Sequence, residues 1–263
     1  MVDFENKPHY DVYDLKKLMK SLRDPGGCPW DREQTHTSIR RNLLEEAYEA
    51  AEAIDEDDTE HLLEELGDVL LQVVFHAGIA EEAGRFDLDG IADATCKKLI
   101  RRHPHVFGEI RAKDSSESLT FWEDIKRSEK LQETVSDAMS TVARSLPALW
   151  RAEKIQKKAA KAGFDWPDRS GALDALRAEL RELEDAIASG NGIEEELGDL
   201  LFSAVNVARF LNVDPEKALG SSSDKFISRF ARVENLLRAT GRRPEDVTLD
   251  EMESLYQQAK LEE

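Results

Sequence analysis

Cysteine is scarce in this sequence, which contains only Cys28 and Cys96. Two isolated thiols form neither a disulfide framework nor a Cys-x-x-Cys zinc site. No neighbouring pattern indicates the lowered pKa that a catalytic thiol requires. We therefore expect both cysteines to be structural or incidental, and nothing in the sequence favours a catalytic cysteine.

Long apolar runs and an excess of basic residues are also absent. No stretch approaches the roughly 20 apolar residues that cross a bilayer, and the start of the chain, with Asp3 and Glu5, lacks a signal-peptide pattern. The 55 acidic residues outnumber the 36 basic ones, for a net charge of −19. Such a charge opposes general binding to phosphate backbones. We expect a cytoplasmic protein with neither a membrane nor a nucleic acid as partner.

Strand-like alternation and proline are rare, and from about Ser38 onward the pattern is helical. Ala, Leu, Glu and Lys dominate, and apolar residues recur at intervals of three and four. One such stripe, which we expect to face the core, consists of Leu62, Leu66, Val69, Leu70 and Val73. The predicted fold class is all-α.

An acidic pattern is present twice. Leu66-Gly67-Asp68 follows Glu64 and Glu65, and Leu197-Gly198-Asp199 follows Glu195 and Glu196. Further pairs keep the same order: Glu46 and Glu49 with Glu179 and Glu182 at an interval of 133, Lys98 and Arg102 with Lys225 and Arg229 at 127, and Trp122 and Lys126 with Tyr256 and Lys260 at 134. This order indicates tandem copies of one helical unit. We predict an N-terminal domain over 1–134, a linker over 135–146 and a C-terminal domain over 147–263.

The acidic residues of the first copy have helical spacing. Glu45, Glu46 and Glu49 share one helix, and Glu65 and Asp68 share the next. A short turn over 55–59 makes the two helices antiparallel neighbours, and we expect Gly67 to permit their close approach. Clustered like charges require a cation, and oxygen ligands without His or Cys favour Mg²⁺ or Mn²⁺. Because Mg²⁺ commonly completes its shell with phosphate oxygens, the pattern predicts metal-assisted hydrolysis of a nucleotide or another polyphosphate.

Two further elements have alternative interpretations. A basic run ends the next predicted helix, comprising Lys97, Lys98, Arg101, Arg102, His103 and His105. It forms either a local patch for an anionic ligand or the cationic end of a helix, and both can hold at once. Trp30 and Trp122 either stack on a base or pack in a core or interface.

These residues resemble the MazG nucleoside triphosphate pyrophosphohydrolases, members of the all-α pyrophosphatase superfamily. The family pattern is EExxE followed by ExxD, and here Glu45-Glu46-Ala47-Tyr48-Glu49 precedes Glu65-Leu66-Gly67-Asp68. Residues 24–31, 101–107 and 145–149 also look like the two-domain members. The resemblance covers nearly the whole chain and predicts two MazG-like helical bundle domains in tandem.

The resemblance implies hydrolysis of a nucleoside triphosphate between the α and β phosphates, a role in clearing nucleotides from the pool, and a homodimer. It implies Mg²⁺ ligands in both units: Glu46, Glu49, Glu65 and Asp68, and Glu179, Glu182, Glu196 and Asp199. The implied nucleotide contacts are Lys98, Arg102, Trp122, Lys126, Lys225, Arg229 and Tyr256. Our mechanistic hypothesis assigns catalysis to Glu45, Glu46 and Glu49, with Glu45 or Glu49 accepting a proton from the attacking water.

The second copy departs from the family pattern. Ala178 replaces the first Glu of EExxE, and Ala175 and Gly192 lie where the family has lysines. We therefore favour the first unit as the catalytic one, although the second is the principal site in some two-domain members. Two other interpretations are a non-catalytic helical binding module and a ferritin-like di-iron protein. The ferritin-like protein needs repeated Glu-x-x-His pairs, whereas the only such spacing, Glu33 to His36, lies outside the repeat.

Overall fold

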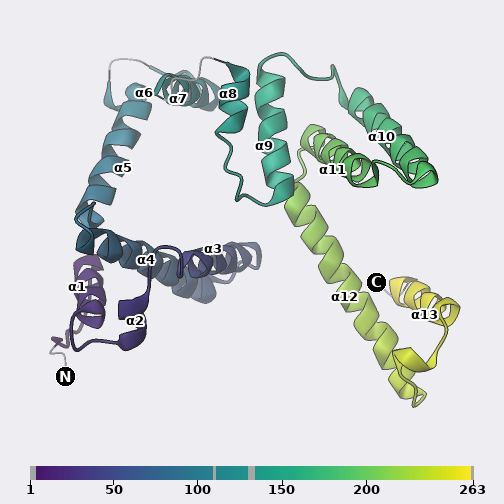
Figure 1. Cartoon of the computed structure of the whole chain (residues 1–263), viewed down its shortest axis with the longest axis horizontal. Helices are drawn as coiled ribbons and strands as arrows, with labels where there is room; N and C mark the ends of the chain where they lie inside the picture. The colour runs from purple at the N-terminus through teal and green to yellow at the C-terminus, as the bar shows by residue number, and fades with distance from the viewer. Residues whose placement is uncertain (1–3, 109–110, 130–133, 262–263) are drawn as a thin grey trace. The chain divides into compact units, whose positions relative to one another are not determined.

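The chain divides into two helical units, Met1–Lys126 and Arg127–Glu263 (Figure 1). The computed structural model describes residues 4–108, 111–129 and 134–261, and these ranges contain helices and no strand. The all-α prediction is confirmed. The helix α8 (Val135–Ser140) lies within the predicted linker, whose bounds stay a prediction. None of the helices in the described ranges is both long and apolar enough to span a bilayer.

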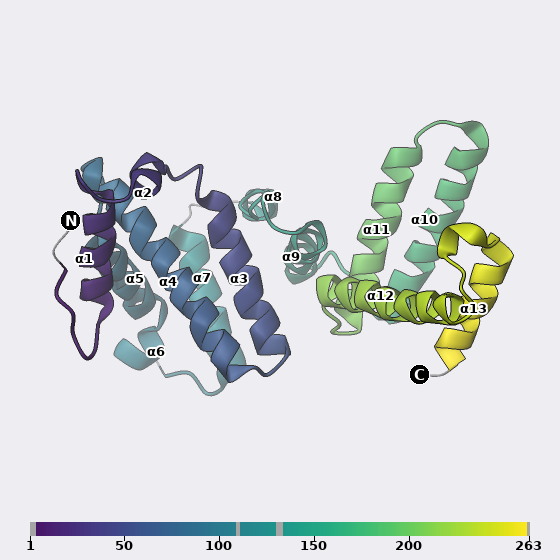
Figure 2. The same ribbon diagram turned by 90° about the horizontal axis from the view of Figure 1, so that it is seen from below.

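Unit 1 is organised around its longest helix, α4. In chain order its helices are α1 (Val12–Arg23), α2 (Pro29–Glu33), α3 (Arg40–Asp55), α4 (Thr59–Glu82), α5 (Leu88–Arg102), α6 (Pro104–Phe107) and α7 (Ser115–Glu129). Helices α3 and α4 form an antiparallel pair, which Figure 2 shows side by side. Asp58 caps α4, since its Oδ1 accepts the backbone N–H groups of Glu60 and His61 at 3.1 and 3.0 Å.

The core of unit 1 lies where α1, α4 and the start of α5 meet. Its buried side chains are Met19, Ile39, Val74, Phe75, Ala77 and Leu88. All of the α4 members belong to the C-terminal half of that helix. The N-terminal half of α4 is left to pair with α3, which has consequences for the acidic residues on both helices.

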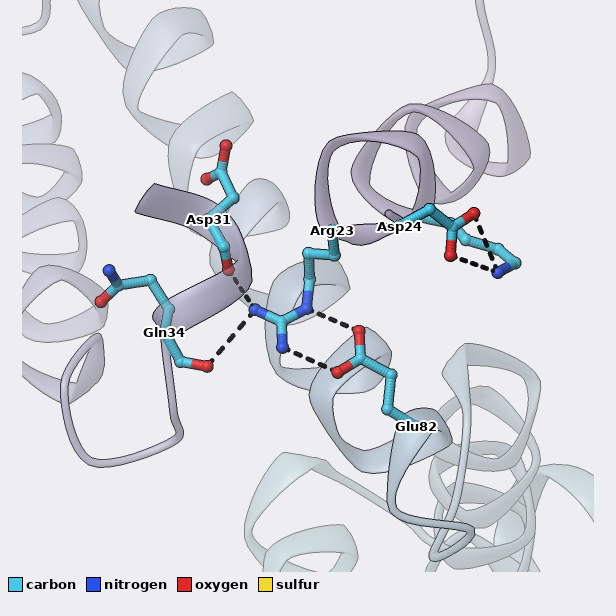
Figure 3. A network of polar contacts seen from close by, with 6 residues as sticks. Arg23, Asp24, Asp31, Gln34 and Glu82 are labelled. Atoms are coloured by element: carbon cyan, nitrogen blue, oxygen red, sulfur yellow. Dashed lines mark hydrogen bonds and ion pairs between the residues drawn. The ribbon is translucent and has the colours of Figure 1, made fainter. Parts of the chain in front are cut away.

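Arg23 joins four segments of unit 1 (Figure 3). Its Nε and Nη2 each donate to a carboxylate oxygen of Glu82 at 2.7 Å. Its Nη1 donates to the backbone oxygens of Asp31 and Gln34, and its guanidinium lies 5.2 Å from the centre of the Phe75 ring. The Arg23 guanidinium therefore connects the end of α1 to α2, to the loop after α2 and to α4.

The turn before α2 requires glycine at position 27. A Cβ there would lie 2.2 Å from the backbone oxygen of Leu22, so any side chain would force the backbone to move. The Cys28 N–H donates to that same oxygen at 2.8 Å. The turn is thus fixed by contact with the last turn of α1.

We expect Arg23→Ala to destabilise the packing of α1 on α4 by about 2–4 kcal/mol, since it removes several charge-assisted hydrogen bonds from a buried guanidinium. Lys20→Ala is the matched control, because it removes only an exposed pair with Asp24, at 2.9 Å, one turn along the same helix. Such exposed pairs contribute about 0–1 kcal/mol. Amide hydrogen exchange in α1 and α4 measures both effects. Equal losses of protection in the two variants would contradict the role given to Arg23.

Two histidines form a close pair beside this core. His36 Nδ1 and His76 Nδ1 lie 2.8 Å apart, and the rings stack with centroids 5.1 Å apart. Burial, together with neighbouring His36, lowers the pKa of His76. One ring must donate and the other accept, so protonation of both would place two N–H groups against each other.

The pair makes the stability of unit 1 depend on pH. Because the folded pKa of His76 is below its unfolded value, the neutral form stabilises the fold above about pH 6.5, and this contribution is lost as pH falls from there toward the lowered pKa. We expect α4 protection against hydrogen exchange, corrected for intrinsic rates, to fall between pH 7 and pH 5, and to fall less in His76→Phe. Unit 2 contains no histidine and serves as the internal control. An equal pH response in His76→Phe would contradict the assignment.

Unit 2 repeats the antiparallel pair. Its helices are α8, α9 (Ala148–Lys161), α10 (Arg169–Ser189), α11 (Ile193–Phe210), α12 (Pro215–Ala239), the short 3-10 turn η1 (Pro244–Asp246) and α13 (Leu249–Leu261). Helix α10 packs along α11, and α13 packs on α12 around buried Val233, Leu237 and Ala259. The pair α10–α11 corresponds to α3–α4, as the repeat predicts.

Two expectations about the acidic helices were wrong. Leu66 and Leu70, placed by the sequence in a core-facing stripe, are 52% and 39% exposed, so no described element of unit 1 fully covers them. Gly67 is not a site of close helix approach, since a Cβ built on it meets no atom within 4 Å. Val73, at the other end of the stripe, does pack against the core of unit 1.

Candidate metal and nucleotide sites

The first carboxylate cluster consists of Glu46 and Glu49 on α3 and Glu65 on α4. One carboxylate oxygen from each lies within 4.8 Å of the others. The three-residue spacing places Glu46 and Glu49 on one side of α3, and the antiparallel pairing brings Glu65 opposite them. The structure thus brings together three residues that the sequence singled out.

The electrostatics of this cluster are unfavourable without a cation. Burial raises the pKa of Glu46, and the neighbouring charges of Asp68, Glu49 and Glu65 raise it further. A raised carboxylate pKa means that the folded state resists ionisation of Glu46. A bound cation reverses this penalty, because it favours the charged form.

One oxygen of the cluster suits a metal ligand. Glu65 is only 7% exposed, and its Oε2 is buried without a hydrogen-bond partner. Its other oxygen, Oε1, lies 3.2 Å from His61 Nε2. A buried carboxylate oxygen left unpaired is costly. An all-oxygen set with one such atom fits a hard divalent cation such as Mg²⁺ or Mn²⁺.

The second carboxylate cluster consists of Glu179 on α10 with Glu196 and Asp199 on α11. One oxygen of each lies within 4.8 Å of the others. Burial raises the pKa of Glu179, followed by the charges of Glu182 and Asp199, and burial with the same two neighbours also raises that of Glu196. The repeat therefore reproduces the arrangement of unit 1 in a more open form, since Glu196 is only half-buried.

Three predicted residues lie beside these clusters instead of within them. Asp68 and Glu182 act on the neighbouring carboxyl groups through their charge, but neither belongs to the close groups of oxygens. Glu45 Oε1 accepts a hydrogen bond from Arg41 Nε at 2.6 Å. The predicted roles of all three stay predictions.

A cation–aromatic cluster lies at the far end of α5. The Arg102 guanidinium carbon is 5.0 Å, and Lys126 Nζ 4.7 Å, from the centre of the Trp122 ring. Arg102 is buried, and Lys98, one turn earlier, is exposed. Stacking on an aromatic face holds such cations in place. The structure thus brings together three of the four predicted nucleotide contacts of unit 1.

Unit 2 has a smaller version of this cluster. The Arg229 guanidinium lies 5.9 Å from the Tyr256 ring centre, and the Phe226 ring is 5.7 Å from the same ring. Lys225, the remaining predicted contact, is exposed on α12. Among the described residues, a tyrosine with one stacked cation thus replaces the tryptophan with two that unit 1 has.

Within unit 1 the acidic and cationic clusters occupy different regions. Glu65 and Asp68 lie in the N-terminal half of α4, and the rise of about 1.5 Å per residue puts the end of that helix about 20 Å beyond Asp68. Helix α5 then leads away from this end instead of running back along α4 (Figure 1). The cations of α5 therefore do not close over the carboxylates of the same unit.

Sequence reasoning overlooked His61. It precedes Glu65 by four residues on α4, a spacing that places the two side chains on one face. That spacing is present in the sequence, but the repeated acidic pattern does not include His61. The equivalent position in unit 2, at the interval of 131 that relates Glu65 to Glu196, is Gly192.

These features define a class: an all-α tandem repeat in which each unit holds paired-helix carboxylates suited to a divalent cation, together with a cation–aromatic cluster suited to an anion. The MazG nucleotide pyrophosphohydrolase domain matches this chain twice, over residues 34–107 and 169–233. Both matches contain a carboxylate cluster. The chain belongs to the MazG family, and the resemblance seen in its motifs is confirmed.

Two bacterial relatives are similar in sequence to nearly the whole chain. The chain is 45% identical over 247 residues to a protein of Thermotoga maritima named nucleoside triphosphate pyrophosphohydrolase/pyrophosphatase MazG, covering 94% of each. It is 46% identical over 254 residues to the nucleoside triphosphate pyrophosphohydrolase of Escherichia coli K12, covering 95% of this chain and 97% of that protein. It also matches 52% of the Bacillus subtilis protein YabN, at 42% identity.

Proposed function

We propose that this protein is a Mg²⁺-dependent nucleoside triphosphate pyrophosphohydrolase that releases a nucleoside monophosphate and pyrophosphate. The observation that carries the proposal is the first carboxylate cluster, in which Glu65 approaches two further carboxylates and has a buried, unpaired Oε2. Family membership and the names of the two bacterial relatives support the same reaction. A non-catalytic module would not require carboxylates to be grouped at this cost in burial and charge repulsion.

We assign a separate catalytic role to each group of site residues. Glu46, Glu49 and Glu65, with Asp68 beside them, would hold Mg²⁺, which supplies Lewis acidity toward phosphate oxygens and lowers the pKa of water. Glu45 or an oxygen of Glu49 not engaged by metal accepts the proton of the attacking water. In the homodimer proposed below, Arg102 and Lys126 of a second copy would offset the charge of the departing pyrophosphate. The α-phosphorus is the proposed point of attack.

We assign turnover to unit 1. Unit 2 has Ala178 where unit 1 has Glu45 and glycine at position 192, and among its described residues only Arg229 stacks on the Tyr256 ring. Its carboxylate cluster still suits metal binding. The second unit therefore contributes binding or assembly in this proposal, and the first unit contributes chemistry.

A homodimer would bring acidic and cationic clusters together. Unit 1 separates them along α4 and α5, and α4 exposes Leu63, Leu66 and Leu70 beside the acidic cluster. Leu197 and Leu201 are exposed at the corresponding places on α11. Exposed apolar stripes of this kind are typical of subunit interfaces. Sedimentation at twice the mass of 29.7 kDa is the expected result.

Separation of reaction products tests the proposal. Each common ribo- and deoxyribonucleoside triphosphate is incubated with the protein and Mg²⁺, and the phosphorus products are resolved by ³¹P NMR. Monophosphate and pyrophosphate in equal amounts are expected, and the preferred base and sugar follow from the relative rates. Release of orthophosphate and nucleoside diphosphate would contradict it.

A further inference from the structure

We propose that His61 is a positioning residue of the first carboxylate cluster: it holds Glu65 so that a single oxygen, Oε2, is presented to the metal. This inference rests on the proposed function, and it concerns how unit 1 differs from unit 2. The starting observation is the division of Glu65 into one paired oxygen and one buried, unpaired oxygen.

The pairing is geometrically constrained. His61 Nε2 lies 3.2 Å from Glu65 Oε1, within reach of an N–H donor, and both residues belong to the first two turns of α4. The backbone of His61 is itself fixed, because its N–H donates to the capping carboxylate of Asp58 at 3.0 Å. The imidazole is therefore anchored at its base by the helix cap and directed at Glu65 by the four-residue spacing.

The contact with His61 fixes the orientation of the second carboxylate oxygen of Glu65, Oε2. A carboxylate with one oxygen held by a donor has a fixed orientation, and such supporting contacts typically change metal affinity by 10- to 100-fold. Glu65 is 93% shielded from solvent, its Oε1 lies beside His61 and its Oε2 has no hydrogen-bond partner, so we assign Oε2 to the cation that Glu46 and Glu49 would share. Preorganisation of this ligand is what we assign to His61.

Unit 2 has no equivalent of the contact between His61 and Glu65. Gly192 at the equivalent position has no side chain, and it adopts φ of +74° as the cap before α11 begins at Ile193. Glu196 consequently has no histidine one turn before it, and it is less buried than Glu65. Both clusters contain carboxylates at corresponding positions. They differ because Glu65 on α4 has a histidine contact and Glu196 on α11 does not.

Binding of Mn²⁺ alone, followed by the EPR signal of the free ion at pH 7.5, tests the inference without turnover. The full chain carries Glu196→Gln and Asp199→Asn, so that the second cluster does not contribute. Into this parent we place His61→Leu, which removes the donor, and His61→Gln, which keeps an N–H donor. Circular dichroism checks that each variant keeps the helical content of the parent.

We expect His61→Leu to weaken Mn²⁺ binding about tenfold and His61→Gln to stay within about threefold of the parent. In turnover, His61→Leu should raise the Mg²⁺ concentration needed for half-maximal rate while kcat at saturating Mg²⁺ changes little. Unchanged or tighter binding in His61→Leu, or equal weakening in both variants, would overturn the role of His61. If the parent itself binds no Mn²⁺ and adding Glu46→Gln changes nothing, the proposed metal site fails, and the role of His61 fails with it.

Discussion

Glu46→Gln should lower kcat for nucleoside triphosphate hydrolysis by at least about 100-fold, an effect of the size seen when one charged group is removed from a preorganised site. The amide keeps the shape of the side chain but offers a weaker ligand to Mg²⁺. Initial rates with saturating Mg²⁺ and nucleotide give the comparison. At about 1.36 kcal/mol for each factor of ten, the loss corresponds to about 2.7 kcal/mol of transition-state stabilisation.

Glu179→Gln is the matched control, since it makes the same chemical change at the corresponding position of α10. Because we assign turnover to unit 1, this variant should keep kcat within about threefold of the wild type, a change of under 1 kcal/mol. The reverse result, with Glu179→Gln inactive and Glu46→Gln active, would move catalysis to unit 2. Loss of activity in neither variant would mean that both clusters were wrongly assigned.

Removal of divalent metal should abolish activity and destabilise the protein at the same time. Burial, followed by repulsion between neighbouring carboxylates, raises the pKa values of Glu46, Glu179 and Glu196 and makes their ionised forms unfavourable when no cation is present. A ligand that binds only the folded state at 100 times its Kd adds about 2.7 kcal/mol of stability. Activity after EDTA treatment should fall to background and return with Mg²⁺ or Mn²⁺, but not with Na⁺.

The sign of the pH effect sharpens this prediction. A carboxyl group whose pKa is raised on folding stabilises the fold while protonated, and this contribution is lost as pH rises through the unfolded value and then the raised folded one. The metal-free protein should therefore lose stability from the clusters as pH rises above about 4.5, and Mg²⁺ should restore it at neutral pH. Glu46→Gln should be more stable than the wild type without metal and should gain less from Mg²⁺. Thermal unfolding with and without EDTA measures all four states, and a Glu46→Gln protein less stable than the metal-free wild type would contradict this account.

Much of the fold followed from patterns in the sequence. The three- and four-residue periodicity predicted helices, and the recurring Leu-Gly-Asp pattern predicted the correspondence of α3–α4 with α10–α11. The three-residue spacing of Glu46 and Glu49 placed them together because helix geometry is local. Local rules were sufficient wherever the chemistry depended on one helix or on one helix pair.

What was missed depended on contacts between distant segments. Periodicity identified the stripe of Leu66 and Leu70 but could not tell whether another element of the same unit covers it. The fork of Arg23 joins residues 59 positions apart, which no local rule predicts. Gly67 was assigned to close packing from its residue type alone, whereas the space beside it is open. His61 follows the same helix rule, since it precedes Glu65 by four residues, but the repeated acidic pattern does not include it.

Hydrolysis in water enriched in ¹⁸O tests the central claim most directly. The wild-type protein, Mg²⁺ and the preferred nucleoside triphosphate are incubated in H₂¹⁸O, and the isotope shift of each phosphorus resonance shows which product received the oxygen of water. Attack at the α-phosphorus predicts one ¹⁸O in the nucleoside monophosphate and none in pyrophosphate. Label in pyrophosphate, or the appearance of labelled orthophosphate as the primary product, would contradict the reaction proposed for this protein.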